Sequence, residues 1–107
     1  MTGETVHMTY IKVLWHHSFP DEPTVLYSEI DKDRWERRKV YVFRDGQFGY
    51  ASETEATNSV RLSIEPLPPL SKISSDAQFD PREIEKSEFD DVWSKAHLAT
   101  GEARRTD

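Results

Sequence analysis

The stretch from Tyr10 to Ala51 constrains the fold most, because four short β segments follow one another within it. Residues 10–16, 24–31 and 35–44 alternate between two side-chain sets with the period of two that is typical of strands. Asp45-Gly46 then supplies residues that tolerate a positive φ at a two-residue hairpin turn. The sequence therefore predicts an antiparallel β-meander.

The predicted turn also sets the register of the last hairpin. A two-residue loop places Phe43 opposite Phe48 and Tyr41 opposite Tyr50, so that the four rings line one face as cross-strand pairs. Val40 and Val42 would then lie on the other face. Since both faces are partly apolar, we expect one to meet a helix and the other to meet a loop or a partner.

The second half of the chain predicts further strands and two helices. Alternation over 60–64 predicts a fifth strand, and residues 82–85 could add a short edge strand as a sixth. Residues 70–77 have the apolar spacing of a short helix.

An amphipathic helix of about eleven residues is predicted near the C-terminus. Ser87 is a good N-cap residue, and Thr100-Gly101 would end the helix. Its apolar positions have the i, i+3, i+4, i+7 spacing, and Trp93 is the expected main anchor: Phe89, Val92, Trp93 and Ala96.

The fold class expected from these elements is α+β. An antiparallel β-meander of about five strands, with a short sixth, would be packed by the C-terminal helix and one short helix. A chain of 107 residues is long enough for one real core. We expect a single domain over 10–98, between a flexible N-terminus (1–9) and a flexible polar tail (99–107).

Charge and composition narrow the possible partners. Fourteen Lys and Arg against twenty Asp and Glu give a net charge of −6, which argues against free nucleic acid as a ligand and suits a cationic small molecule or a basic protein partner. The absence of cysteine excludes disulfides and zinc–thiolate sites and favours the cytoplasm. We expect no signal peptide and no membrane span, since residues 1–9 are polar and no apolar run reaches about 18 residues.

His16 and His17 with Asp21 and Glu22 form the first candidate site. Imidazole and carboxylate groups together suit Zn²⁺, Mn²⁺ or Fe²⁺, or an acid–base pair. Adjacent strand residues point to opposite faces, so only one of the two histidines can face a given site. The alternative is a histidine that packs near the core and acids that solvate a loop.

Trp35 with Arg37 and Arg38 forms the second candidate, an anion or nucleotide pocket. A guanidinium beside an indole can hold a planar anion by stacking and bidentate hydrogen bonds. Strict alternation places Trp35, Arg37 and Lys39 on one face, and Glu36 and Arg38 on the other. The alternative is a solvated strand whose cations pair with nearby carboxylates.

The sequence contains no nucleophile motif and no glycine-rich phosphate loop, and beyond the candidate set of His16, His17, Asp21 and Glu22 we assign it no catalytic residue, metal ligand or cofactor. The expected function is a small non-enzymatic interaction module, such as a regulatory or toxin-neutralising (immunity-like) protein, acting as a monomer or weak homodimer. The likeness to toxin-neutralising proteins is an analogy of fold and charge. A small-molecule or metal-binding domain, or the anion pocket, is the alternative.

Several runs of this sequence resemble an uncharacterised family of small bacterial single-domain proteins. The runs span most of residues 10–96: Tyr10-Ile11-Lys12-Val13, Trp15-His16-His17, Phe19-Pro20-Asp21-Glu22-Pro23, Leu26-Tyr27-Ser28-Glu29, Arg34-Trp35-Glu36-Arg37-Arg38-Lys39-Val40, Phe43-Arg44-Asp45-Gly46 and the late Phe89–Val92–Trp93 pattern. The resemblance implies a bacterial source and a compact domain. It carries over no catalytic residue.

Overall fold

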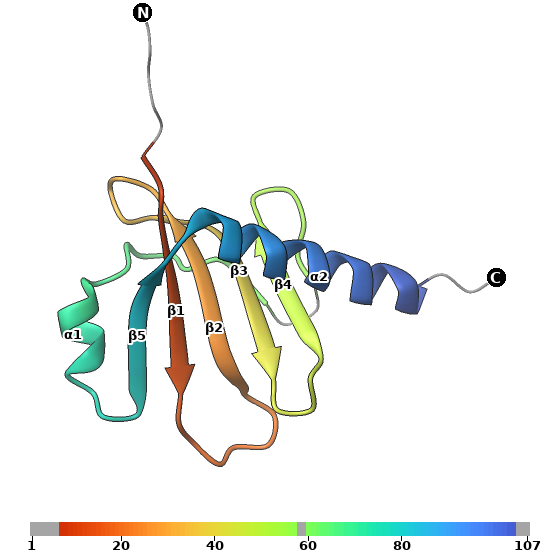
Figure 1. The fold of residues 1–107 in the computed structure, drawn as a ribbon, viewed down its shortest axis with the longest axis horizontal. Helices are drawn as coiled ribbons and strands as arrows, with labels where there is room; N and C mark the ends of the chain where they lie inside the picture. Colours follow the sequence, from red (N-terminus) through yellow and green to blue (C-terminus); the bar gives the residue numbers. More distant parts are fainter. Residues whose placement is uncertain (1–6, 58–59, 105–107) are drawn as a thin grey trace, which may run out of the picture.

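The structure, a computed structural model, describes residues 7–57 and 60–104, with side chains as far as Ala99. One antiparallel sheet has the strand order β4-β3-β2-β1-β5, and the helix α2 crosses one face of it (Figure 1). The elements are β1 (Thr9–Trp15), β2 (Pro23–Ile30), β3 (Glu36–Phe43), β4 (Phe48–Ser52), α1 (Leu70–Ser74), β5 (Phe79–Ile84) and α2 (Lys86–Arg104). The predicted α+β class is confirmed. The predicted flexible ends include residues 1–6 and 105–107, which are outside the described residues.

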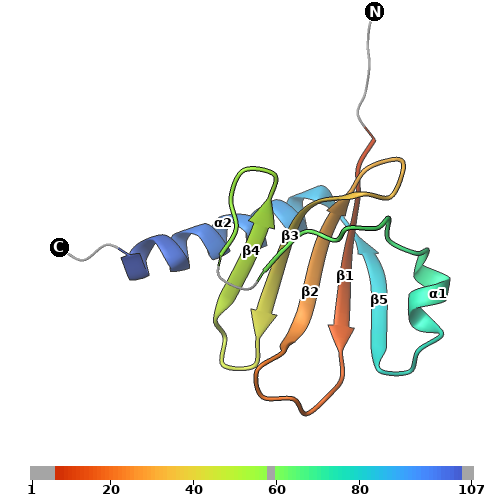
Figure 2. The same cartoon turned by 180° about the vertical axis from the view of Figure 1, so that it is seen from behind.

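The two faces of the sheet are covered by different parts of the chain. The helix face, which carries Tyr10, Lys12 and Leu14 of β1, packs against α2. The coil face, which carries Ile11 and Val13, is crossed by the segment that leads from β4 to α1 (Figure 2). The expectation that one face meets a helix and the other a loop is therefore correct.

The β3–β4 hairpin has a three-residue loop rather than the predicted two-residue turn. Phe43 N–H donates to the Gln47 carbonyl at 2.9 Å, and Gly46 has a φ of +88°. An Asp-Gly pair also fits this loop, in which the glycine takes the left-handed position. The register shifts by one residue, and Tyr50 faces Val40. The predicted pairs Phe43–Phe48 and Tyr41–Tyr50 are therefore wrong.

The predicted fifth strand at residues 60–64 is also wrong, because this segment is coil. Val60 is buried against the sheet glycine Gly49, where an added Cβ would lie 2.7 Å from the Val60 Cγ2. The Ser63 N–H donates to the Glu36 carboxylate instead of joining a strand ladder. The fifth strand is β5, which is longer than the edge strand predicted at 82–85 and pairs with β1.

The amphipathic helix is confirmed, but its bounds and its main anchor differ from the prediction. It begins at Lys86, and the N–H groups of Glu88 and Phe89 donate to the Glu85 carbonyl. It continues past Gly101 to Arg104, since a glycine costs a helix only about 1 kcal/mol and keeps its N–H. Phe89 is fully buried, whereas Trp93 is only partly buried.

The replacement Gly46→Val should destabilise the protein by about 1–2 kcal/mol, because a side chain at positive φ meets the following carbonyl. Gly46→Asn is the control and should cost less, since asparagine tolerates this conformation. Urea unfolding of both variants measures the difference. Equal stability of the two variants would contradict the assigned loop.

Phe89→Ala should cost about 3–5 kcal/mol, because it removes a fully buried ring from the contact between α2 and the sheet. Trp93→Ala should cost less, since part of its ring is already in water. Lys95→Ala, at an exposed position of the same helix, should change the free energy of unfolding by no more than about 0.5 kcal/mol. Thermal unfolding followed by circular dichroism gives the order, and a larger loss at Trp93 would restore that residue as the main anchor.

Candidate functional site

The loop after β1 is organised around His17. The Phe19 N–H donates to His17 Nδ1 at 2.9 Å, which leaves Nε2–H to donate to the Pro23 carbonyl at 2.8 Å. Arg44 donates to the His17 carbonyl at 2.7 Å. Both ring nitrogens are therefore used within the loop, and no lone pair of this ring faces a metal site.

The other three residues of the first candidate lie apart from that ring. His16 is exposed, and its backbone N–H donates to the Gln78 carbonyl. Asp21 and Glu22 are exposed in the loop. Within residues 7–57 and 60–104, no group of three or more His, Asp or Glu side chains is arranged to hold a metal ion. The structure thus gives the four residues no common centre.

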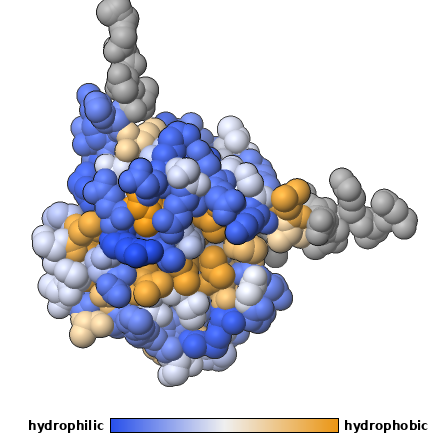
Figure 3. All heavy atoms as spheres, in the orientation of Figure 1, coloured by the Kyte–Doolittle hydropathy of each residue, from blue (hydrophilic) through white to orange (hydrophobic). Residues whose placement is uncertain are grey.

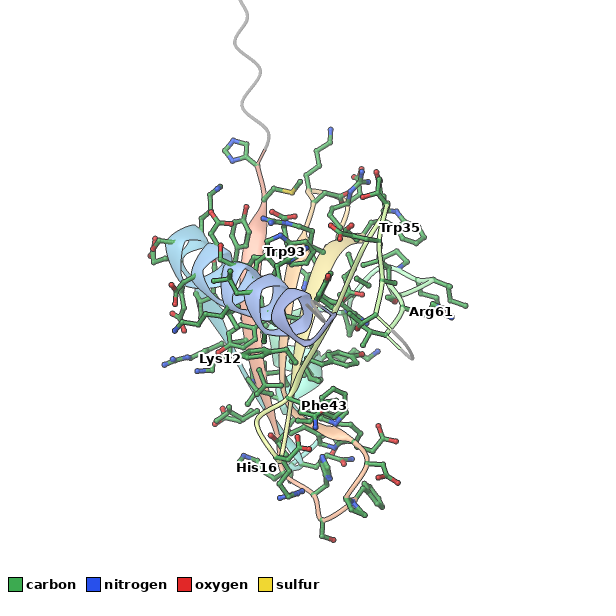
Figure 4. All side chains as sticks on the ribbon, turned by 90° about the vertical axis from the view of Figure 1, so that its right-hand side faces the viewer. Lys12, His16, Trp35, Phe43, Arg61 and Trp93 are labelled. Atoms are coloured by element: carbon green, nitrogen blue, oxygen red, sulfur yellow. The ribbon has the colours of Figure 1, made fainter. Side chains whose placement is uncertain are left out.

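The second candidate is divided between the two faces of the sheet. Arg38 lies on the helix face with Glu29, whereas Arg37 pairs with Asp31 and Glu53. Trp35 is 41% exposed in the turn before β3. In Figure 4, His16 and Trp35 lie at opposite ends of the sheet. The two candidate groups therefore do not combine into one site.

Arg38 is the centre of a partly buried ionic cluster. Its Nε and one terminal nitrogen each donate to Glu29 at 2.7 Å, and the same terminal nitrogen reaches Asp90 of α2 at 3.2 Å. The guanidinium carbon lies 4.8 Å and 4.9 Å from the ring centres of Phe89 and Trp93. Tyr10 donates its hydroxyl to Glu29 at 2.9 Å. The cluster joins three strands to α2.

The electrostatics of this cluster are those of a structural ion pair. Burial alone would raise the pKa of Glu29, but the hydrogen bonds from Arg38 and Tyr10 outweigh it and hold the pKa below its ordinary value of 4.5. Burial and the bond to Glu29 raise the pKa of Tyr10 to about 12. Groups shifted in these directions keep their charge state at neutral pH, and neither is suited to exchange a proton there.

A second ion pair is buried on the coil face. Lys39 Nζ lies 3.1 Å from Glu36, and it donates to the Tyr41 hydroxyl at 3.0 Å. Glu36 also accepts hydrogen bonds from the Ser28 hydroxyl and from the Ser63 N–H of the coil. Burial alone would lower the pKa of Lys39, but the Glu36 charge and Tyr41 raise it above its ordinary value. The predicted separation of Glu36 and Lys39 onto opposite faces is wrong.

An aromatic cluster lies at the other end of the coil face. Trp15 lies 4.3 Å from the His17 ring and 5.7 Å from the Phe79 ring, and His17 stacks on Phe19 at 5.3 Å. An apolar groove of about 330 Å³ adjoins Phe79 between α1 and the strands, lined by Val13, Leu26, Pro68, Lys72, Ile73, Asp76 and Phe79. We call these aromatic and groove residues together the coil-face surface. Its ring contacts were missed at the sequence level, because Trp15 and Phe79 lie 64 positions apart.

Comparison with known proteins gives the family of the chain. A family model described as a domain of unknown function (DUF6881) matches residues 9–98. The chain belongs to this family. No curated protein and no solved structure matches it. Among the described residues, neither helix combines the length and the apolar character of a membrane span.

Arg38→Met should destabilise the protein by about 3 kcal/mol at pH 7, because it leaves the Glu29 carboxylate buried without its partner. The low pKa of Glu29 gives the wild type stability above pH 4.5 that is lost as the pH falls through the folded pKa. In the variant the pKa of Glu29 should rise, so the difference between the two proteins should shrink towards pH 4.

The control is Arg37→Met, the neighbouring cation on the exposed pair with Glu53. Its side chain is 42% exposed, and its loss should cost no more than about 1 kcal/mol at any pH. Urea unfolding of the three proteins between pH 4 and pH 8 measures both effects. A destabilisation by Arg38→Met that does not change with pH would contradict the assigned role of Glu29.

Proposed function

We propose that this protein is a non-enzymatic interaction module of the bacterial cytoplasm that binds a basic protein on its coil-face surface. The exposure of Phe19 carries the proposal. Its side chain is 56% exposed, although the loop that presents it is fixed by the hydrogen bonds of His17 and Arg44. A rigid loop loses little entropy on binding, and exposed aromatic residues are common anchors of interfaces.

The apolar groove supports the same surface. Phe19 is in contact with the groove through Trp15 and Phe79, so one continuous surface joins the loop to α1. The groove is lined mainly by apolar side chains, which can take up an apolar side chain of a partner. Lys72 and Asp76 of the α1 region stand at its edge and can contact polar groups around that side chain.

The charge around this surface favours a basic partner. Asp21 and Glu22 follow Phe19 in the loop, and neither makes an ion pair with a described residue. Asp76 lines the groove, and the chain as a whole carries a charge of −6. Unpaired carboxylates beside apolar anchors complement Lys and Arg. A toxin-neutralising protein is one class of module that would use such a surface.

The proposal is tested by capture from cytosol of the source cell with three immobilised proteins: wild type, Phe19→Ser and Leu98→Ser. Leu98 is the control, since it is 65% exposed but belongs to α2 on the opposite face. We expect one stoichiometric basic protein, identified by mass spectrometry, that Leu98→Ser retains and Phe19→Ser loses. Binding of that purified protein should weaken as salt is raised.

Two results would overturn the proposal. One is the recovery of no stoichiometric partner at low ionic strength. The other is a partner that Phe19→Ser binds as well as the wild type does. Phe19 is largely exposed, so its replacement should leave the melting temperature close to that of the wild type.

A further inference from the structure

The helix face carries an apolar row that α2 leaves uncovered. Leu14, Val25, Val42 and Phe48 stand opposite one another on four adjacent strands, and all four are only partly buried. Figure 3 shows apolar atoms gathered on this face below the path of α2. One row of apolar side chains thus extends across most of the sheet and faces water.

The space beside α2 has the dimensions of a second helix. Phe89 and Trp93 contact Tyr10 and Tyr50, so α2 lies over the two rows that contain these tyrosines. The row of Leu14 is the next one along the strands, about 7 Å further on. Packed helices lie about 8–10 Å apart, so a helix resting on this row would also contact α2.

Two cations lie beside one end of the row, two residues along the strands from its terminal pair Leu14 and Asp80. Lys12 and Arg82 stand directly opposite each other on β1 and β5, an arrangement of like charges that destabilises a sheet. Glu88 lies 4.0 Å from Lys12, but the Arg82 guanidinium makes no hydrogen bond or ion pair with any residue that the structure describes. With Leu14 and Asp80 the two cations line a pocket of about 200 Å³.

We propose that the row and its two cations are a docking site for an amphipathic helix of a partner protein, with an acidic end over Lys12 and Arg82. The row spans three strand spacings, or about 14 Å, which corresponds to about ten helical residues. The apolar stripe of the partner helix would cover the row, and the carboxylates at its end would relieve the repulsion between Lys12 and Arg82. The site is on the face opposite to the coil-face surface and does not depend on the function proposed there.

The test uses the full chain and two labelled helical peptides with the same leucine stripe. One peptide has glutamates at one end, and the other has lysines at the same positions. Fluorescence anisotropy at low salt should show the acidic peptide binding more tightly by about tenfold. Val25→Thr should weaken both peptides, because it places a hydroxyl in the apolar row.

Arg82→Gln separates binding from folding. It should weaken the acidic peptide several-fold while the melting temperature stays equal or rises, because it removes a repulsion from the sheet. Lys32→Gln, at an exposed cation of the turn between β2 and β3, is the matched control and should bind as the wild type does. A melting temperature that falls markedly in Arg82→Gln would give this residue a role in the fold and overturn the proposal.

Three further outcomes would also overturn it. They are equal affinity for the two peptides, binding of neither, and an Arg82→Gln variant that binds the acidic peptide as tightly as the wild type. Sedimentation equilibrium is run in parallel. A homodimer that the acidic peptide disrupts and that Arg82→Gln abolishes would assign the row to a second copy of this chain instead.

Discussion

An extra residue in β3 determines where the internal charges of this protein lie. Glu29 pairs with Arg38 and Ile30 with Glu36, so Arg37 has no partner on β2. Because of this bulge, Glu36 and Lys39 lie on the same face and form an ion pair, while Arg38 turns to the other face and holds Glu29. Strict alternation would have placed Glu36 beside Arg38 and left Lys39 on the coil face without its carboxylate.

Each of these ion pairs also holds the segment that packs on its own face of the sheet, which is α2 on the helix face and the coil with Ser63 on the coil face. Arg38 binds Asp90 and contacts two rings of α2, and Glu36 accepts the Ser63 N–H of the coil. A buried ion pair stabilises a protein little more than apolar residues of the same size would. Its clearer effect here is to fix where α2 and the coil lie on the sheet. Both pairs lie near the β2–β3 turn. The helix and the coil are therefore held over the same half of the sheet, and apolar side chains of the other half face water on both sides.

The sequence predicted an element correctly where the spacing of its apolar residues fits one kind of secondary structure. It failed where the same residues are compatible with two structures. Alternation identified β1, β2 and β3, and the spacing from Phe89 to Ala96 identified the buried face of α2. Asp45-Gly46 fits loops of two or three residues, and the choice depends on packing Tyr50 under α2. Residues 60–64 have the period of a strand but no free edge beside β4, because Ser52 and Ala51 already pair with Glu55 and Ala56.

The candidate residues show why a ligand site is harder to predict than a strand. His17 next to carboxylates has the composition of a metal site, but its function depends on what its two nitrogens contact. Those contacts are the Phe19 N–H and the Pro23 carbonyl, which close the loop on itself. A metal ligand needs a free lone pair, whereas a residue that holds a loop needs both nitrogens bonded. His17, which suggested a metal site, therefore acts by fixing the loop that exposes Phe19 to solvent. The same reasoning applies to Arg37 and Arg38, because their carboxylate partners come from other strands or loops and could not be read from the local sequence.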